Sequence, residues 1–255
     1  MTHTRMPAVF VGHGTPMGAI EPSRWTDAWG KVGATLGRPK AILSVSAHWL
    51  TRGGALVTAS GFPAMNYDMY GFPQPLYEVR YPAPGDPALA QEISATVNAR
   101  SDTAWGFDHG TWLVLKYMFP AADIPVVQLS MNYSEPPAFH YEMGKRLQFL
   151  RERGVLILCS GNFVHNLNFR NAENPPMDWA LEFDSTMNAH IADGNHEPVI
   201  DFRKLGRIAQ LAHPTHDHFL PIFYFLGLKN PQDTVSVFTD GFQWPAVSMR
   251  SFVIS

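Results

Sequence analysis

The sequence of 255 residues lacks several features that mark particular classes of protein. Its single cysteine, Cys159, cannot form a disulfide within the chain and lies in an apolar run, as is typical of proteins in a reducing compartment. No apolar stretch is long enough to cross a bilayer, and glycine and histidine interrupt the first apolar run too early for a signal peptide. We therefore expect a cytoplasmic protein that does not bind membranes.

Charge and short motifs exclude further classes of function. The formal net charge is −3, and lysine and arginine do not cluster, so no basic surface for nucleic acid is expected. A P-loop, a glycine-rich dinucleotide fingerprint and a nucleophile elbow are all missing from the sequence. Chemistry on phosphate or nicotinamide groups is therefore not indicated.

The apolar residues that are present predict an α/β fold. Hydrophobic residues make up 45% of the chain and charged residues 16%, which is typical of a globular protein with a large core. Short continuous apolar runs predict strands buried on both faces, at residues 8–12, 41–47, 56–59, 126–130, 155–160, 235–239 and 249–254. Amphipathic patterns predict helices between them, at 23–36, 87–99, 110–118, 138–153, 179–192 and 202–211. We expect a single catalytic domain over 1–255, with a mixed, mostly parallel sheet flanked by helices on both faces.

Histidines follow three of the predicted strands. His13 comes directly after the first strand, His48 after the second, and His165 shortly after the strand at 155–160. Parallel strands deliver the residues at their carboxyl ends to one shared crevice, so these imidazoles are expected to lie close together. Imidazole is the commonest metal ligand in proteins and also a proton carrier near neutral pH. The pattern predicts a site for Fe(II), Zn or Mn at this edge of the sheet.

Two further segments supply candidates for the same site. His109 stands at a predicted loop–helix junction, where it could donate a proton into a cleft, and Asp108 before it could cap the helix. Because two imidazoles alone hold a divalent ion weakly, a third ligand is expected from the histidine-rich segment 213–221. Spacing alone leaves His216, Asp217 and His218 all as candidates.

Smaller features complete the predicted site. Asn162 and Asn166 flank His165 and are candidates to orient its ring. The tyrosine-rich segment 61–84 is expected to form a long ordered loop over one end of the sheet. This loop, together with Trp49, Phe163 and Tyr133, is a candidate to shape a substrate pocket.

Six of these motifs, in this order, resemble the class III extradiol ring-cleaving dioxygenases, and specifically their 4,5-DOPA extradiol dioxygenase branch. The motifs stand at residues 12–17, 46–49, 81–85, 105–110, 161–167 and 214–221. The resemblance implies that His13 and His48 are metal ligands and that His218 contributes. It also implies that His165 either ligates the metal or acts as the acid–base residue, with His109 assisting in proton handling. Related protocatechuate-type enzymes use a glutamate as third ligand, and His218 is the apparent substitute here.

The resemblance also implies a reaction. The expected enzyme is an oxidoreductase that binds Fe(II), in a site that Zn(II) can also occupy, and cleaves a catechol such as DOPA with O2. Cleavage at the 4,5 position would give a seco-DOPA-type semialdehyde. Two alternatives use the same imidazoles: a zinc-dependent hydrolase that activates water, and a non-catalytic metal-binding protein.

Overall fold

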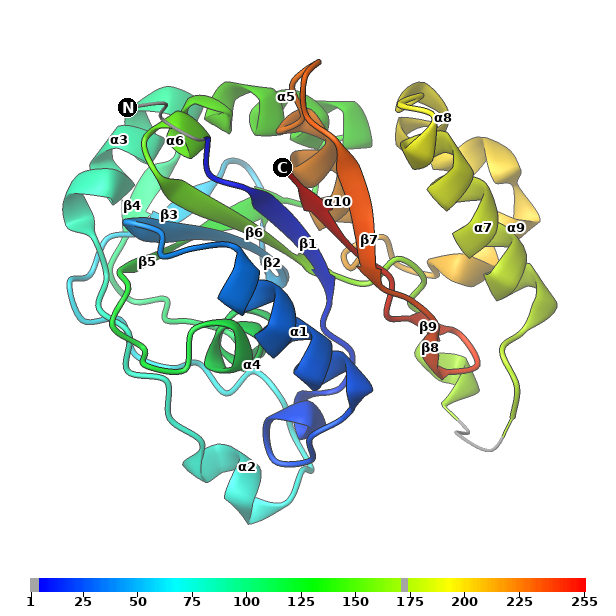
Figure 1. The fold of residues 1–255 in the computed structure, drawn as a ribbon, viewed down its shortest axis with the longest axis horizontal. Coiled ribbons are helices and arrows are strands. Elements are labelled where there is room, and N and C mark those ends of the chain that lie inside the picture. The colour runs from blue at the N-terminus through cyan, green and yellow to red at the C-terminus, as the bar shows by residue number, and fades with distance from the viewer. Residues whose placement is uncertain (1–4, 171–173) are drawn as a thin grey trace.

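The apolar runs of the sequence form one large central sheet, shown in Figure 1 for the computed structural model, which describes residues 5–170 and 174–255. Within these residues the sheet has eight strands in the order β4-β3-β5-β2-β6-β1-β10-β7. Their bounds are β1 (Ala8–Gly12), β2 (Ala41–Thr51), β3 (Leu56–Thr58), β4 (Arg100–Asp102), β5 (Val126–Asn132), β6 (Val155–Gly161), β7 (Val235–Thr239) and β10 (Ser251–Ile254). A separate hairpin pairs β8 (Phe242–Trp244) with β9 (Val247–Ser248).

The sheet is mixed, with a parallel centre. Strand β1 pairs in parallel with β6, β6 with β2, and β2 with β5, while β3 and β4 form a further parallel pair. Antiparallel pairing occurs where β10 meets β1, β7 meets β10, and β3 meets β5. Strands β1, β2 and β6 are therefore adjacent and end at the same edge, which is the arrangement that brings their carboxyl-terminal residues together.

Helices cover both faces of this sheet (Figure 1). Helices α1 and α4 pack on one face against the side chains of Val9 and Val11, whereas α3, α5 and α10 share the other core with Ala8 and Phe10. This alternation follows from the pleat, which points successive side chains to opposite faces. The helices are α1 (Arg24–Thr35), α2 (Gln74–Glu78), α3 (Pro87–Val97), α4 (His109–Met118), α5 (Pro137–Leu147), α6 (Phe149–Glu152), α7 (Asp178–Ala192), α8 (Glu197–Ile200), α9 (Arg207–Ala212) and α10 (Leu220–Gly227).

The predicted fold class is confirmed: an α/β protein with a mixed sheet between two helical layers. Local signals placed several helix ends correctly. Asp86 accepts hydrogen bonds from the backbone N–H groups of Ala88 and Leu89 at the start of α3, and Asp108 accepts one from Thr111 at the start of α4. None of the described helices is both long and apolar enough to span a bilayer.

Several predicted elements differ from the structure; the helix predicted at 138–153, for example, is divided into α5 and α6 at Gln148. Strand β2 continues to Thr51, so His48 lies inside the strand rather than after it, beyond an irregularity in the pairing between Val45 and Leu50. The helix predicted at 202–211 divides at Gly206, whose positive φ of 59° interrupts it. A 3₁₀ turn, Phe202–Leu205, precedes the division, and α9 follows it.

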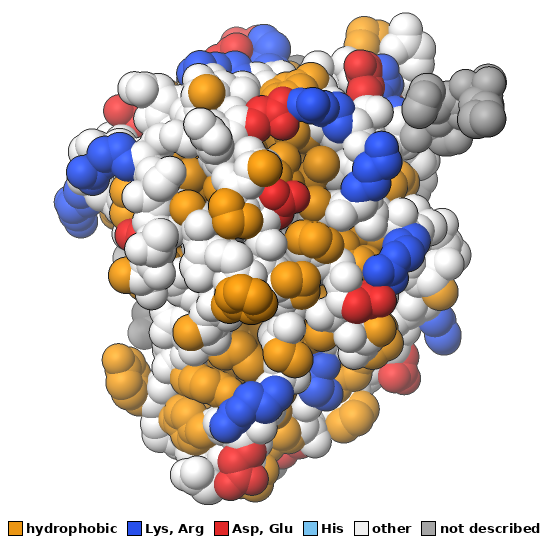
Figure 2. Space-filling view, turned by 90° about the vertical axis from the view of Figure 1, so that its left-hand side faces the viewer, with side chains coloured by type: hydrophobic (Ala, Val, Ile, Leu, Met, Phe, Trp, Pro, Cys, Tyr) orange, Lys and Arg blue, Asp and Glu red, His pale blue; other side chains and the backbone are white. Residues whose placement is uncertain are grey.

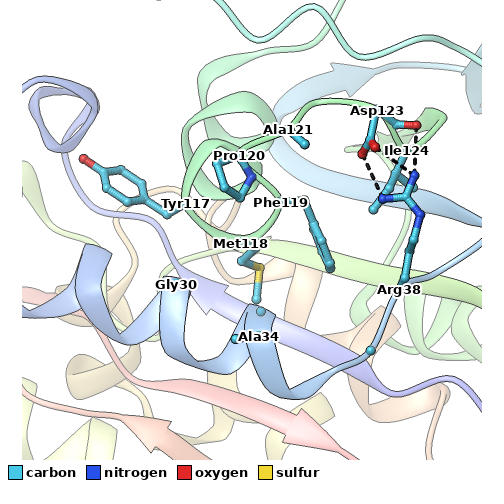
Figure 3. A pocket seen from close by; sticks show the side chains of 12 residues that line it. Gly30, Ala34, Arg38, Tyr117, Met118, Phe119, Pro120, Ala121, Asp123 and Ile124 are labelled. Carbon is cyan, nitrogen blue, oxygen red and sulfur yellow. Dashed lines mark hydrogen bonds and ion pairs between the residues drawn. The ribbon is translucent and has the colours of Figure 1, made fainter.

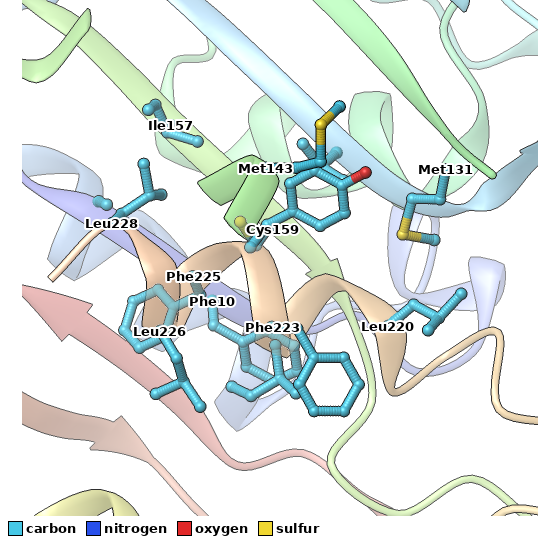
Figure 4. Close-up of a cluster of buried hydrophobic side chains, with 14 of the residues drawn as sticks. Phe10, Met131, Met143, Ile157, Cys159, Leu220, Phe223, Phe225, Leu226 and Leu228 are labelled. Atoms are coloured by element: carbon cyan, nitrogen blue, oxygen red, sulfur yellow. The ribbon is translucent and has the colours of Figure 1, made fainter. Parts of the chain in front are cut away.

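Helix α10 was not predicted as a helix because it is apolar on every side. All of its residues are buried, so the sequence shows no periodic alternation with polar residues. Figure 4 shows its side chains, including Phe223 and Phe225, packed with Phe10 of β1 and with Ile157 and Cys159 of β6. Cys159 is therefore a buried core residue, as its position in the sequence indicates.

Helices α5 and α10 approach closely through glycine. A Cβ atom on Gly144 of α5 would collide with the backbone carbonyl oxygen of Tyr224 in α10. Gly144→Ala is therefore expected to lower the free energy of unfolding by about 1–3 kcal/mol, the usual cost of overpacking a core. The matched variant is Gly30→Ala in α1, where the nearest atom to the new Cβ, the carbonyl oxygen of Tyr117, lies at an ordinary 3.6 Å. This variant is expected to gain up to about 1 kcal/mol, because alanine favours the helix.

Urea unfolding of the two glycine variants and the wild-type protein measures these effects. A Gly144→Ala midpoint equal to that of the wild type would show that the two helices can separate without cost, contrary to the packing described.

On the face of the molecule at the left of Figure 1, the described residues carry charges of both signs. Figure 2 shows hydrophobic side chains on this face dispersed among Lys and Arg and among Asp and Glu. Such a mixed surface is typical of a chain with a small net charge, here −3.

Candidate metal centre and active site

The fold brings all five predicted site histidines together at one edge of the sheet. His13 follows β1, His48 lies near the end of β2, and His165 lies in the loop after β6. His218 stands two residues before α10, and its carbonyl oxygen accepts a hydrogen bond from the backbone N–H of Asn162 at 2.8 Å, which ties its segment to the end of β6. A Cβ on Gly161 would collide with that same carbonyl oxygen, so glycine is needed for this approach.

Three imidazoles form a nearly regular triangle. The ring centroids of His13 and His48 are 5.0 Å apart, those of His13 and His218 5.3 Å, and those of His48 and His218 5.0 Å. Each ring offers one nitrogen, and these three atoms all lie within 4.8 Å of one another. This is the arrangement of a facial set of ligands, which leaves one side of an ion open.

The hydrogen bonds of the outer ring nitrogens decide which nitrogen of each ring faces inward. Ser160 donates its hydroxyl proton to the carbonyl oxygen of Gly110, so its Oγ is left to accept from Nδ1–H of His13, at 3.0 Å. Nδ1 of His48 lies 3.0 Å from a carboxylate oxygen of Asp68, and Nδ1 of His218 lies 2.5 Å from one of Asp217. Protons on the outer nitrogens leave lone pairs on the inner Nε2 atoms.

The residues fit a divalent cation. Nε2 of His13 and Nε2 of His48 face one another at 3.0 Å. With the proton of each ring on its outer Nδ1, two Nε2 lone pairs face one another across this distance. Burial, with the neighbouring His48 adding to it, holds the pKa of His13 well below its ordinary value. Imidazoles whose Nε2 atoms face one another in this way form a donor set that a cation satisfies.

His109 and Asp68 lie beside the triangle. His109 opens α4, and its ring centroid is 3.8 Å from that of His48. Asp68 contacts both rings, since one of its carboxylate oxygens lies 3.0 Å from Nδ1 of His48 and 3.0 Å from Nδ1 of His109. Burial alone would raise the pKa of Asp68, but the hydrogen bonds from His109 and His48 outweigh it and hold that pKa below its ordinary value. Asp68 was not predicted as a site residue.

His165 stacks on His218. Their ring centroids are 3.5 Å apart and the rings are nearly parallel, at 10°. His165 is held by its backbone, which donates to the carbonyl oxygen of Ala212 at 3.0 Å and bridges to Val247. Burial lowers the pKa of His165 well below its ordinary value, so the ring is neutral at neutral pH.

The expectation that Asn162 and Asn166 orient His165 is wrong. The side-chain amide of Asn162 donates to the carbonyl oxygen of Ser248 at 3.0 Å, and that of Asn166 donates to the carbonyl oxygen of Leu211 at 2.7 Å. Both asparagines instead tie the loop that carries His165 to neighbouring backbone through their side-chain N–H groups.

The structure also separates the candidates in the segment 213–221. Only His218 of this segment joins the triangle with His13 and His48. His216 stacks on Tyr133 with centroids 4.4 Å apart, and His213 stacks on Phe219 and contacts the carbonyl oxygen of Phe163. Asp217 contacts the outer nitrogen of His218, although it also offers an oxygen close to His165.

A cavity of about 240 Å³ opens above the histidines. Its polar lining consists of His13, His48, His109, His165 and His218. The walls and rim are formed by Gly14, Thr15, Pro16, Met69, Phe72, Leu167, Arg170, Trp244 and Val247. An apolar space with a few convergent polar groups is the usual form of a small-molecule site, and aromatic walls suit an aromatic ring.

The pocket prediction is partly wrong. The segment 61–84 contributes Met69 and Phe72, as expected, but three other predicted aromatics lie elsewhere. Trp49 stacks on Trp105 at 5.3 Å, Phe163 packs in the core, and Tyr133 stacks on His216. Trp244 of the β8–β9 hairpin, which no local pattern marks, takes their place.

A larger cavity, of about 430 Å³, lies between α1 and the end of α4 (Figure 3). Its lining is mainly apolar, including Ala34, Met118 and Phe119, and its charged members Arg38 and Asp123 neutralise each other in an ion pair of 3.0 Å. The lining residues bring no set of proton carriers or metal ligands together, so volume alone does not make it the reactive site.

Comparison with known proteins indicates a family whose enzymes use a metal, in agreement with the imidazole triangle. A family model described as the catalytic LigB subunit of aromatic ring-opening dioxygenase matches residues 8–249. The chain belongs to this family. The LigB match covers β1 through β9, and with them every histidine of the site.

Individual relatives of this LigB-family chain carry related names. It is 43% identical to a 4,5-DOPA dioxygenase extradiol of Escherichia coli K12, over 100% of this chain and 96% of the relative. It is 34% identical to a 4,5-DOPA dioxygenase extradiol of Beta vulgaris, over 95% and 94% of the two chains. The crystal structure of an uncharacterized protein from Escherichia coli K12 matches with a TM-score of 0.85 at 39% identity, covering 98% of this chain and 100% of that one.

The family match establishes the class of reaction but not the substrate. The LigB-family chain is a ring-cleaving extradiol dioxygenase, which uses O2 on a small aromatic substrate, as the motifs indicated. The family is metal-dependent, and the imidazole triangle is a site able to hold the metal. The zinc hydrolase and the non-catalytic metal-binding protein, which the sequence left open, are not favoured.

Proposed function

We propose that this dioxygenase holds Fe(II) through His13, His48 and His218 and opens a catechol with an amino-acid side chain, such as DOPA, by 4,5-extradiol cleavage. The convergence of three imidazoles in a cavity that is also lined by the aromatic side chains of Phe72 and Trp244 supports the proposal. The names of the full-length relatives support the choice of substrate. Residues 1–255 act as one catalytic domain in this proposal.

The bound iron would supply adjacent open positions for the two catechol oxygens and for O2, which brings both reactants into contact. Zn(II) suits the same ligands and would occupy the site without supporting the oxidation. Phe72, Met69 and Trp244 hold the ring plane and exclude water from the floor of the cavity.

Proton transfer falls to the two remaining histidines. In the proposal His165, stacked on His218, is the principal acid–base residue: it accepts the second hydroxyl proton of the catechol and returns a proton as the ring opens. His109 assists from beside His48, with its ring centroid 3.8 Å away. Both atoms of O2 end in the product, one in the new aldehyde and one in the new carboxylate, so no external reductant is required.

The test is anaerobic reconstitution with Fe(II), followed by a panel of catechols under oxygen. We expect O2 uptake matched mole for mole by a yellow semialdehyde, with zinc-loaded protein inactive. A protein that retains only zinc and consumes no O2 with any catechol after iron loading would instead support the hydrolase.

Arg170 at the cavity supplies a basis for choosing among catechols. Among the described residues that line the cavity, Arg170 is the one arginine or lysine. A substrate carboxylate would pair with its guanidinium group. Arg170→Met is expected to lower kcat/KM for DOPA about tenfold or more, because a hydrogen bond to a charged group contributes about 1.5–3 kcal/mol. Dopamine, which differs from DOPA by lacking the carboxylate, should react with nearly unchanged kcat/KM.

The control is Arg100→Met, which removes an exposed arginine from strand β4, outside the cavity lining. Equal losses on DOPA and dopamine in Arg170→Met would show that Arg170 shapes the site without reading the carboxylate.

A further inference from the structure

Asp68 contacts two histidines to which the proposed function gives different tasks. One of its oxygens, Oδ2, lies 3.0 Å from Nδ1 of His48 and 3.0 Å from Nδ1 of His109. Its other oxygen, Oδ1, accepts the backbone N–H of His109 at 2.9 Å. Both oxygens of this carboxylate therefore have partners. The ring of His48, from β2, and the ring of His109, from α4, share the oxygen Oδ2.

The backbone around Asp68 is held firmly against the start of α4. Met65 and Phe107 form a parallel bridge, and the backbone N–H of Asn66 donates to the carbonyl oxygen of Phe107 at 2.7 Å. The indole N–H of Trp112 in α4 donates to the carbonyl oxygen of Asn66 at 3.1 Å. The loop therefore carries Asp68 to the site on a rigid support, although the loop has little regular secondary structure.

We infer that Asp68 is a positioning residue that couples the metal ligand His48 to the proton carrier His109. By accepting from Nδ1–H of His109 and lying 3.0 Å from Nδ1 of His48, it keeps the Nε2 lone pair of each ring facing the site. It also fixes the two rings relative to each other, with centroids 3.8 Å apart. The inference rests on the proposed function for the tasks of the two histidines, but the contacts themselves do not depend on it.

Asp68→Asn is the informative variant because it keeps the shape and changes one acceptor into a donor. If the amide nitrogen takes the place of Oδ1, it meets the backbone N–H of His109, which is also a donor. If it takes the place of Oδ2, it meets both rings and drives them to the tautomer with the proton on Nε2. The first orientation leaves two donors facing each other, so the second is expected, and it removes the acceptor that the two rings share.

The first readout needs no catalysis. In metal-free wild-type protein, ¹⁵N NMR of the imidazoles is expected to show His48 and His109 protonated at Nδ1, and Asp68→Asn is expected to move at least one of them to Nε2. The affinity for Fe(II), titrated anaerobically, is expected to fall about 10–100-fold, the usual effect of removing a hydrogen-bond partner of a ligand. Unchanged tautomers together with unchanged affinity would overturn the inference, even if no catechol were ever cleaved.

The second readout separates Asp68 from a carboxylate that is hydrogen-bonded to a ligand ring but to neither proton carrier. Asp217 contacts Nδ1 of His218, so Asp217→Asn is expected to weaken Fe(II) binding but to affect kcat at saturating iron much less than Asp68→Asn does. For Asp68→Asn we expect kcat at saturating iron to fall roughly 10–100-fold as well. In a double-mutant cycle, Asp68→Asn should slow a His109→Gln enzyme little further, because both changes act through the same ring. Full additivity in that cycle would contradict the coupling.

Metal stoichiometry distinguishes positioning from ligation. His48, Asp68 and His109 also present three ligand-capable atoms close together, which is a possible site for a second ion. We expect one Fe(II) per chain, in wild type and in saturated Asp68→Asn alike. Two ions per chain in the wild type, reduced to one in Asp68→Asn, would show that Asp68 is a ligand and would overturn the inference.

Discussion

Replacing His13 with alanine is expected to abolish tight Fe(II) binding and ring cleavage together. The ring of His13 is buried, and its Nε2 faces that of His48 at 3.0 Å, so the change removes one corner of the triangle and leaves two imidazoles. Two imidazoles hold a divalent ion weakly. The loss of affinity should exceed the roughly 10–100-fold cost of removing only a hydrogen-bond partner of a ligand. Anaerobic titration with Fe(II) and O2 uptake with DOPA measure the two effects.

His216→Ala is the matched control for this variant. His216 belongs to the same histidine-rich segment as His218, but its ring stacks on Tyr133 away from the triangle. It should keep its iron and its turnover. An iron affinity that is unchanged in His13→Ala but lost in His216→Ala would contradict the ligand set.

The variant His165→Gln is expected to keep its iron and lose turnover. The ring of His165 stacks on that of His218. It is not one of the three rings whose ligand atoms converge, which are those of His13, His48 and His218. Glutamine retains hydrogen-bonding groups but cannot carry a proton, and a general acid–base residue contributes about 10²–10⁴-fold to the rate. We expect kcat for DOPA to fall by that factor while the iron content and the Fe(II) affinity stay close to wild type.

Iron analysis of the purified, reconstituted variant distinguishes the two roles that the sequence left open for His165. Loss of the metal in His165→Gln would make His165 a fourth ligand, and the proton carrier would then have to be sought in His109. Retained iron with unchanged kcat would remove His165 from the chemistry altogether.

Much of the fold could be predicted because its determinants are local. The strands at 8–12 and 155–160 are continuous apolar runs, and the helix that starts after Asp108 has its cap in the adjacent sequence. Helix α10 escaped because burial on every side removes the periodic pattern. The shared sheet edge then made the proximity of His13, His48 and His165 predictable from chain order alone.

The parts of the site that escaped prediction depend on contacts between distant segments. Asp68 reaches two histidines only because its loop is bridged to Phe107, about forty residues further along the chain. Trp244 enters the cavity through a hairpin near the end of the chain, and it carries no motif. Spacing could not choose between His216 and His218, because the choice depends on Tyr133, a partner from another segment.

The most direct test of the metal centre is a crystal grown anaerobically with Fe(II) and measured on both sides of the iron absorption edge. The triangle of imidazoles predicts a single anomalous peak within bonding distance of Nε2 of His13, His48 and His218, with the side facing the aromatic cavity open. An iron peak centred instead among His48, Asp68 and His109, or one that lies away from His13, would contradict the account.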